Sequence, residues 1–443
     1  MHFEATSQAE SDSADSGALG QTMYAMVERL YPICRSITGD GVRATLADVA
    51  AHIPLQVMEV PTGTQVFDWT VPREWNIRDA YIIGPNGDKI VDFRKHNLHV
   101  LNYSVPVRAK LSRAELMPHL FSLPEHPEWI PYRTSYYKDN WGFCLPHRQL
   151  EGLAEGTYEV CIDSSLEAGS LTYGECVIPG ASREEVLFSC HVCHPSLCND
   201  NLSGIAVATQ LASYLLSRRN RYTYRFVFIP GTIGSITWLA RNEEIIPHIK
   251  HGLVIVCVGD GGPFTYKKSR RADAEIDRAA MHVLKTTTAS HHLIDFYPYG
   301  YDERQYCSPG FNLAVGSLSR SSHGQFTQYH TSADDLELVQ PPFLAEALDK
   351  YRLVVDVLER NRTYVNLNPN CEPQLGRRGL YRQVGSGGGT KINEMALLWV
   401  LNLSDGMHSL LDIAERSGER FSAIADAAQA LVEVGLLKST SGN

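Results

Sequence analysis

The middle of the chain alternates short apolar runs with segments whose apolar residues recur every three or four positions. The apolar runs have the length of buried strands and cover residues 186–189, 224–229 and 253–258. The periodic segments predict helices at residues 204–216, 235–246, 274–284 and 343–359. Strands that alternate with helices form a mostly parallel sheet with helices on both faces. We therefore expect an α/β fold for this region.

Other parts of the chain have different patterns. Residues 66–157 are rich in Trp, Tyr and Pro and contain strand-like pieces, which predicts a β-rich domain inserted into the α/β domain. The α/β domain should then comprise residues 20–65 and 158–371. Residues 1–19 are acidic, small and polar, without the basic start and apolar core of a signal peptide, so we expect a disordered tail.

Residues 372–443 predict three short helices followed by a Gly-Leu-Leu strand, a pattern typical of a winged-helix module. The module has seven basic and eight acidic residues, whereas a DNA-binding domain normally has a basic face. We therefore expect this module to pack on the main domain or on a protein partner.

The overall composition excludes several classes of partner. The formal net charge of −10 disfavours a nucleic-acid backbone, and no apolar run reaches the ~18 residues needed to span a bilayer. The ten cysteines are scattered, as is typical of reduced thiols. We expect a cytoplasmic protein without a membrane or nucleic-acid partner. A homo-oligomer is compatible with the sequence.

The first predicted strand of the α/β region leads directly into a cluster of side chains that can bind metals. These side chains are Cys190, His191, Cys193, His194, Cys198 and Asp200. Ligands bind where the strands of open α/β sheets end, and imidazole and carboxylate groups are suitable zinc ligands. Two alternatives exist: Asp200 or Asn201 caps the next helix while the histidines are solvated, or the cysteines and His194 form a thiolate site that lacks a second CxxC.

Two further residues occupy positions where ligands are expected. Asp260 follows the strand at 253–258, and His330 lies in a loop before the last long helix of the α/β region. Together with His191 and Asp200 they would supply two imidazoles and two carboxylates, enough for one zinc ion, or for two if one carboxylate bridges them. The spacing alone is weak support because the ligands come from separate loops.

Several stretches of this chain are similar to a known family. They are LYPICRSITGDGVR, DWTVPREWNIRDAYI, PYRTSYYKDNWGFC, SCHVCHPSLCNDNLSG, GYDERQYCSPG and QYHTSADDL. The chain resembles the zinc aminopeptidase and glutaminyl cyclase superfamily, and more closely the bacterial aminopeptidase-like domain proteins with an inserted β-rich domain and a C-terminal winged helix. The resemblance implies that His191, Asp200, Asp260 and His330 bind zinc, with Asp200 as the bridge. It also suggests substrate contact by Tyr329.

The chain lacks an acidic residue at two positions where the resemblance implies one. Gly231 stands in a turn where related proteins have a glutamate, and Gln328 stands where they tend to have another. In the superfamily, a glutamate at the first position serves as metal ligand or general base, and glycine can do neither. Glu303 could act as a substitute base and Arg304 could clamp a substrate carboxylate; the alternative is an internal Glu303–Arg304 pair that orders the loop. Cys307 has no identifiable base.

We therefore predict a zinc-dependent hydrolase that cleaves an amide bond of a small aminoacyl or peptidyl substrate and has altered catalytic residues. One alternative is a degenerate peptidase fold that serves as a ligand-binding or partner scaffold. Another is a repurposed enzyme for acyl transfer or cyclisation at the same site.

Overall fold

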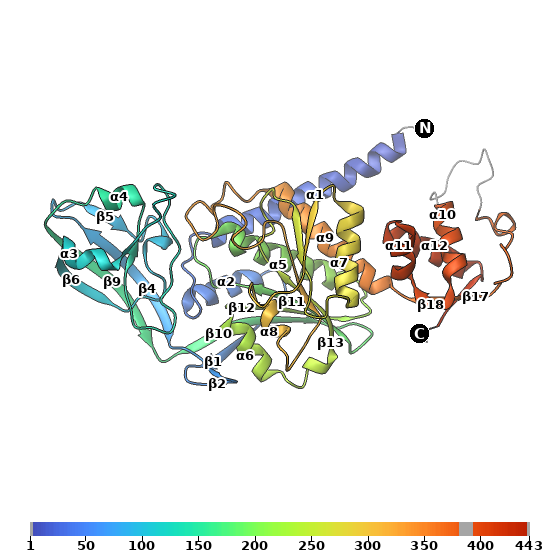
Figure 1. The fold of residues 1–443 in the computed structure, drawn as a ribbon, viewed down its shortest axis with the longest axis horizontal. Helices are drawn as coiled ribbons and strands as arrows, with labels where there is room; N and C mark the ends of the chain where they lie inside the picture. Colours follow the sequence, from blue (N-terminus) through green and yellow to red (C-terminus); the bar gives the residue numbers. More distant parts are fainter. Residues whose placement is uncertain (1–2, 381–392, 441–443) are drawn as a thin grey trace.

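The computed structural model describes residues 3–380 and 393–440 and arranges them in three parts (Figure 1). The β-rich domain lies at one end, the α/β domain lies in the centre and the winged-helix domain lies at the other end. The metal-capable loop after residue 189 belongs to the central part.

The central sheet has eight strands in the order β1-β10-β12-β11-β13-β16-β14-β15. Their bounds are β1 Gln56–Pro61, β10 Ser170–Ile178, β11 Glu185–His191, β12 Thr223–Ile229, β13 Ile249–Ile255, β14 Phe264–Lys267, β15 His291–Ile294 and β16 Val315–Ser319. The four strands β12, β11, β13 and β16 are parallel, while β10 and β14 join them antiparallel on the two sides. The predicted α/β fold is confirmed, and antiparallel strands flank its parallel centre.

Helices cover both faces of this sheet because its central strands are apolar on both sides. In β11, Val186 and Phe188 pack into one hydrophobic cluster, and Leu187 between them packs into the other. The first cluster receives α1 (Phe3–Leu30), α2 (Asp40–Ala50), α5 (Gly204–Leu216), α7 (Glu275–Thr287) and α9 (Pro341–Arg360). The second receives α6 (Ile233–Arg241) and α8 (Glu303–Tyr306).

The N-terminal segment differs from the expectation. The structure has helix α1 from Phe3 onward, where the sequence predicts a disordered tail over residues 1–19. The C-terminal half of α1 buries Met23, Met26 and Val27 in the core beside α9.

The β-rich domain has a four-stranded sheet in the order β5-β4-β9-β6 and its own hydrophobic core. Its strands are β4 Glu74–Ile83, β5 Lys89–Asp92, β6 Val107–Ser112 and β9 Thr157–Glu167. Shorter elements of this domain are α3 Arg113–Leu116, β7 Leu120–Phe121, β8 Phe143–Cys144 and α4 His147–Glu151. The short hairpin of β2 (Gln65–Val66) and β3 (Trp69–Thr70) instead contacts α6, and Val66 packs into the second cluster of the α/β domain. Residues 159–167 of β9 pair with β4, so this domain extends past the predicted boundary at residue 157.

The winged-helix domain also begins earlier than the predicted residue 372. Strand β17 (Thr363–Asn366) is the middle strand of its sheet, between β18 (Asp405–Ser409) and β19 (Leu437–Ser439). The three helices are α10 (Glu394–Leu403), α11 (Leu410–Ser417) and α12 (Phe421–Glu433). Residues 381–392 and 441–443 of the predicted module lie outside the described residues.

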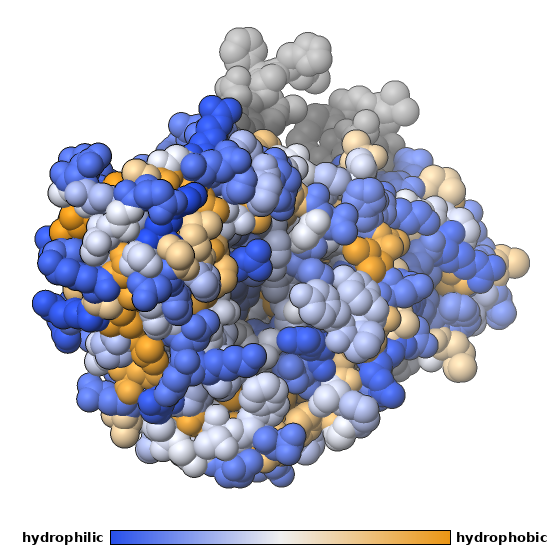
Figure 2. Space-filling model, turned by 60° about the vertical axis from the view of Figure 1, so that its left-hand side comes forward, coloured by the Kyte–Doolittle hydropathy of each residue, from blue (hydrophilic) through white to orange (hydrophobic). Residues whose placement is uncertain are grey.

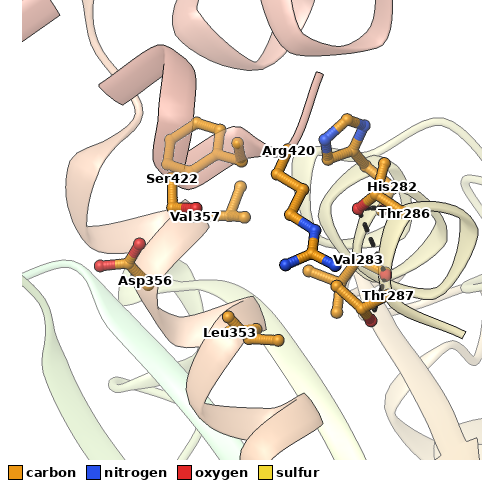
Figure 3. Close-up of a pocket in the computed structure, with 10 residues that line it drawn as sticks. His282, Val283, Thr286, Thr287, Leu353, Asp356, Val357, Arg420 and Ser422 are labelled. Atoms are coloured by element: carbon orange, nitrogen blue, oxygen red, sulfur yellow. Dashed lines mark hydrogen bonds between the residues drawn. The ribbon is translucent and has the colours of Figure 1, made fainter. Parts of the chain in front are cut away.

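The winged-helix domain shares one continuous hydrophobic cluster with the α/β domain. Arg278 of α7 also pairs with Asp412, at 2.5 Å, and with Glu415 of α11. A cavity of about 90 Å³ lies where α7, α9 and α12 meet, and Figure 3 shows Arg420 pointing into it. This close packing agrees with a module that docks on its neighbouring domain.

The face of the molecule that includes the β-rich domain is mostly polar (Figure 2). Figure 2 shows the molecule with the β-rich domain turned forward, where hydrophilic residues dominate and apolar residues form small groups. Among the described residues, no helix combines the length and apolar character that crossing a membrane requires.

We predict that Arg278→Ala lowers the free energy of unfolding by about 1 kcal/mol or less, because the pairs with Asp412 and Glu415 are partly exposed. Urea denaturation measures the change. Arg416→Ala is the matched control, since Arg416 is an exposed arginine on α11, the helix that carries Asp412 and Glu415. Equal effects of the two substitutions would contradict a contribution of the Arg278 pairs to docking.

Candidate metal centre

The end of β11 and the loop that follows it bring a buried carboxylate between two imidazoles. His191 is the last residue of β11, and Asp200 lies in the turn before α5. Asp200 Oδ1 is 2.9 Å from His191 Nε2, and Asp200 Oδ2 is 3.0 Å from His330 Nε2. The side chain of Asp200 is fully buried. Three of the four predicted ligands therefore meet, with one imidazole at each oxygen of Asp200.

A third imidazole completes the cluster. The donor atoms of His191, His194 and Asp200 all lie within 4.8 Å of one another, and the ring centroids of His194 and His330 are 5.2 Å apart. From the sequence, His194 is one of the metal-capable side chains, but it is assigned as a ligand only in the thiolate alternative. The usable signal was its spacing, because two histidines three residues apart in the loop after a strand can face the same centre.

The unpartnered atoms of this cluster fit a bound cation. His191 Nε2 and Asp200 Oδ1 are buried and face each other, yet neither has a hydrogen-bond partner. Leaving such groups unsatisfied costs about 1–3 kcal/mol each. A metal ion in contact with both atoms would remove this cost. Three nitrogen donors and one carboxylate are a suitable set for zinc.

The protonation states also suit metal binding. Burial lowers the pKa of His194 well below its usual value, so its imidazole is neutral and can offer a lone pair. Burial raises the pKa of Asp200, but the neighbouring histidines, His194 first, outweigh it and hold that pKa well below the usual range. A neutral imidazole and an ionised carboxylate are the forms that bind zinc.

Asp334 holds the loop that carries Asp200. Its buried carboxylate accepts the backbone N–H of Asn199 at 2.5 Å and that of Asp200 at 3.0 Å. Burial raises the pKa of Asp334 to about 8. Helix α5 begins only at Gly204 and has Ser203 at its N-cap, so the alternative of Asp200 or Asn201 as helix cap does not apply.

Asp260, the fourth predicted ligand, is not brought into this cluster. Its Oδ1 accepts the side-chain N–H of Asn199 at 3.2 Å, and its Oδ2 accepts the backbone N–H of Gly262 at 3.1 Å and the hydroxyl of Ser321. In this arrangement Asp260 ties three loops together at the end of the sheet. The prediction placed it correctly after a strand, but loop geometry decides where the carboxylate points.

The cysteines do not join the donors. The group of metal-capable side chains found among the described residues contains no cysteine. Burial raises the pKa of Cys190 and Cys198 well above the usual value and that of Cys193 to about 12, which keeps all three as thiols. Burial likewise raises the pKa of Cys307, which disfavours it as a nucleophile.

Glu303 and Arg304 do not form the internal pair considered from the sequence. Glu303 is fully buried, and its Oε1 accepts a hydrogen bond from Lys267 Nζ at 2.8 Å. The Arg304 guanidinium lies over the ring of Tyr299, 5.7 Å from its centroid. Glu303 is therefore part of an internal ion pair, but its partner is Lys267 rather than Arg304.

Asp302 is the acidic residue of this loop that approaches the centre. It is 1% exposed; its Oδ1 accepts a hydrogen bond from Ser235 Oγ at 2.9 Å, and its Oδ2 has no hydrogen-bond partner. Burial raises its pKa to about 6, while His191 and Ser235 act in the opposite direction. The sequence prediction favoured its neighbour Glu303 because the direction of each side chain cannot be read from the order of residues.

Aromatic side chains enclose the three imidazoles. Tyr329 stacks on His330 with centroids 3.9 Å apart, and Tyr301 stacks on His191. Tyr132 comes from the β-rich domain and makes edge contacts with His194 and His330. Its backbone N–H also donates to the carbonyl of His330, whose φ of 56° lies in the left-handed region that few non-glycine residues adopt. The inserted domain thus supplies one wall of the site.

The comparisons with known proteins identify the class of this protein. Residues 24–361 match the family described as "Domain of unknown function (DUF4910)", and residues 362–439 match a winged helix-turn-helix family. The chain belongs to the DUF4910 family, with an aminopeptidase-like domain followed by a winged helix.

Individual relatives agree with this assignment. A Clostridium acetobutylicum protein is 53% identical over 424 residues, which cover 96% of this chain and 98% of the relative. It is provisionally named "polysaccharide biosynthesis protein with aminopeptidase-like domain". A crystal structure of a C. acetobutylicum protein, provisionally described as a peptidase, has a TM-score of 0.92 and 50% identity and covers 98% of this chain and all of that one.

A zinc aminopeptidase from Bacillus subtilis shares the fold at much lower identity. Its TM-score is 0.55 with 11% identity, and the match covers 76% of this chain and 94% of that structure. This likeness concerns the fold alone.

We predict that Asp334→Ala lowers the free energy of unfolding by about 2–4 kcal/mol, because two buried backbone donors lose their acceptor. Asp334→Asn should cost clearly less, since its carbonyl oxygen still accepts a hydrogen bond. Chemical denaturation of both variants tests this. A loss as large in the asparagine variant as in the alanine variant would show that the carboxylate does not act through these hydrogen bonds.

Proposed function

We propose that this protein is a zinc-dependent hydrolase that cleaves an amide bond of a small aminoacyl or peptidyl substrate. The observation that supports the proposal is the buried carboxylate of Asp200 between His191 and His330, with His194 beside them. Zinc bound by these four side chains would polarise the amide carbonyl and activate water.

The residues around the cluster suit this chemistry. Asp334 fixes the backbone of Asp200, and Tyr329 holds the ring of His330 by stacking. The rings of Tyr132 and Tyr329 would restrict the entry of water and contact a substrate. Arg304 has a buried Nε without a hydrogen-bond partner, and its guanidinium can bind a carboxylate of the substrate through two parallel hydrogen bonds.

A second candidate function is ligand binding without turnover. It is favoured by Gly231 and Gln328, which stand where the resemblance to zinc aminopeptidases implies glutamates. The two candidates differ in whether an amide is cleaved.

We predict that the purified protein binds zinc and that His191→Ala and His194→Ala lose it, because each removes one nitrogen donor. Asp260→Asn should retain zinc, since Asp260 hydrogen-bonds to Asn199 and Ser321 instead. Elemental analysis gives the zinc content. Zinc at a hundredfold excess over its Kd should raise the free energy of unfolding of the wild type by about 2.7 kcal/mol.

Circular dichroism shows whether each variant is folded, so that zinc loss is not confused with unfolding. Unchanged zinc content in folded His191→Ala would contradict the metal centre. Loss of zinc in Asp260→Asn but not in His194→Ala would return the centre to the ligand set predicted from the sequence.

We also predict hydrolysis of one class of amide, lost on treatment with a chelator and restored by zinc. The panel should contain aminoacyl p-nitroanilides, dipeptides and, in view of the name of the C. acetobutylicum relative, N-acylated amino sugars. Product analysis by mass spectrometry separates hydrolysis from cyclisation and acyl transfer. Zinc binding without cleavage anywhere in the panel would favour the binding function.

A further inference from the structure

The resemblance implies a glutamate at position 231, where this chain has glycine. A carboxylate from another loop nevertheless lies close to this position. A Cβ placed on Gly231 would lie 3.5 and 3.6 Å from the two carboxylate oxygens of Asp302 and 3.3 Å from His191 Cβ. By standard bond lengths, the carboxylate oxygens of a glutamate lie roughly 3–3.6 Å from its own Cβ. The oxygens of Asp302 are therefore as far from position 231 as the oxygens of a glutamate at that position would be.

The same turn holds Asp302 in place. Ser235, four residues after Gly231, donates its hydroxyl to Asp302 Oδ1 at 2.9 Å. Asp302 Oδ2 is buried and has no hydrogen-bond partner. One oxygen of the carboxylate is thus anchored, and the other is available for a group that enters the site.

Glycine at position 231 is explained by the limited space for a side chain, and not by a backbone conformation that favours glycine. Its φ does not lie in the positive region that favours glycine. A side chain here would meet both His191 and the carboxylate of Asp302. Gly231 and Asp302 therefore form a matched pair, in which the absence of one side chain makes room for the other.

We propose that Asp302, carried by the loop before α8, replaces the glutamate missing at position 231 and handles the proton of the attacking water. This inference rests on the hydrolase function proposed above. It assigns the acidic role to a residue 71 positions later in the chain than the turn that lost it.

The proton transfers balance without any further reactant. The water oxygen forms a bond to the amide carbonyl carbon, and one water proton passes to Asp302 Oδ2. The C–N bond then breaks, its electron pair stays on nitrogen, and Asp302 returns the proton to that nitrogen. The products are a carboxylic acid and an amine, and Asp302 is again a carboxylate.

Each of the other acidic residues near the cluster contacts a cation, hydrogen-bond donors or imidazole rings. Glu303 pairs with Lys267, Asp334 accepts two backbone N–H groups, and Asp260 is bound to Asn199, Gly262 and Ser321. Asp200 lies between two imidazoles. Asp200 Oδ1 and Glu303 Oε2 also have no hydrogen-bond partner, but Asp302 is the one of these five that lies beside Gly231.

The central experiment moves the carboxylate from one loop to the other. Asp302→Asn keeps the shape of the side chain and should retain zinc while turnover falls by about 10²–10⁴-fold. The double variant Gly231→Glu/Asp302→Ala carries the carboxylate on the turn and should recover a large part of that loss. Gly231→Glu alone should melt at a lower temperature, because its side chain meets Asp302.

Matched variants separate this role from general damage. Glu244→Gln makes the same carboxylate-to-amide change at an exposed position and should leave turnover unchanged. Ser235→Ala removes only the anchor of Asp302 and should reduce turnover by less than Asp302→Asn. It also serves as the test if Asp302→Asn does not fold.

A binding measurement provides a readout besides turnover. Leucine hydroxamate binds zinc and can share its acidic proton with a neighbouring carboxylate. Calorimetry should show at least tenfold weaker binding to zinc-loaded Asp302→Asn than to the wild type, and recovery in the double variant.

The results distinguish the two proposals. Normal zinc content, turnover and hydroxamate affinity in Asp302→Asn would overturn the role of Asp302 and leave the hydrolase proposal standing. A wild-type protein that takes up no zinc would overturn the hydrolase proposal, and the role of Asp302 with it. Zinc uptake by the wild type, together with recovered turnover in the double variant, supports both proposals.

Discussion

The burial of Asp200 is the constraint on which the rest of the site depends. An ionised carboxylate without solvent is stable only when positive charge or hydrogen-bond donors surround it. Here the two oxygens face His191 and His330, His194 lies close by, and the backbone N–H of Asp200 is fixed by Asp334. The neutral imidazole of His194 cannot balance the charge by itself. A divalent cation would do so and would also give the unpartnered nitrogen of His191 a partner.

The fold brings these groups together from distant parts of the chain. The parallel strands β11, β12 and β13 have their C-terminal ends on the same side of the sheet. The end of β11 supplies His191, and the loops after β12 and β13 supply Gly231 and Asp260. The β-rich insertion returns to the same edge, where Tyr132 contacts His194 and His330. The site is therefore shared between two domains. The winged helix packs on α7 and α9, and its junction contains a separate small cavity (Figure 3).

Much of this architecture could be predicted because it follows from local periodicity. Apolar runs and helical spacing identified the α/β fold and the winged helix, while the domain boundaries were missed where strands β9 and β17 pair with distant partners. His191, Asp200 and His330 were expected as ligands and do converge. His194 was undervalued, and Asp260 and Glu303 have other partners. Those details depend on the direction of single side chains in loops, which neither composition nor periodicity determines.

The central claim is that one zinc ion is held between Asp200 and the imidazoles of His191, His194 and His330. Anomalous diffraction at the zinc edge, from crystals grown with zinc, tests it most directly. The account predicts one strong peak within bonding distance of Asp200 and at least two of these imidazoles. A peak bound by Asp260 or by the cysteines instead, or no peak beside Asp200, would contradict it.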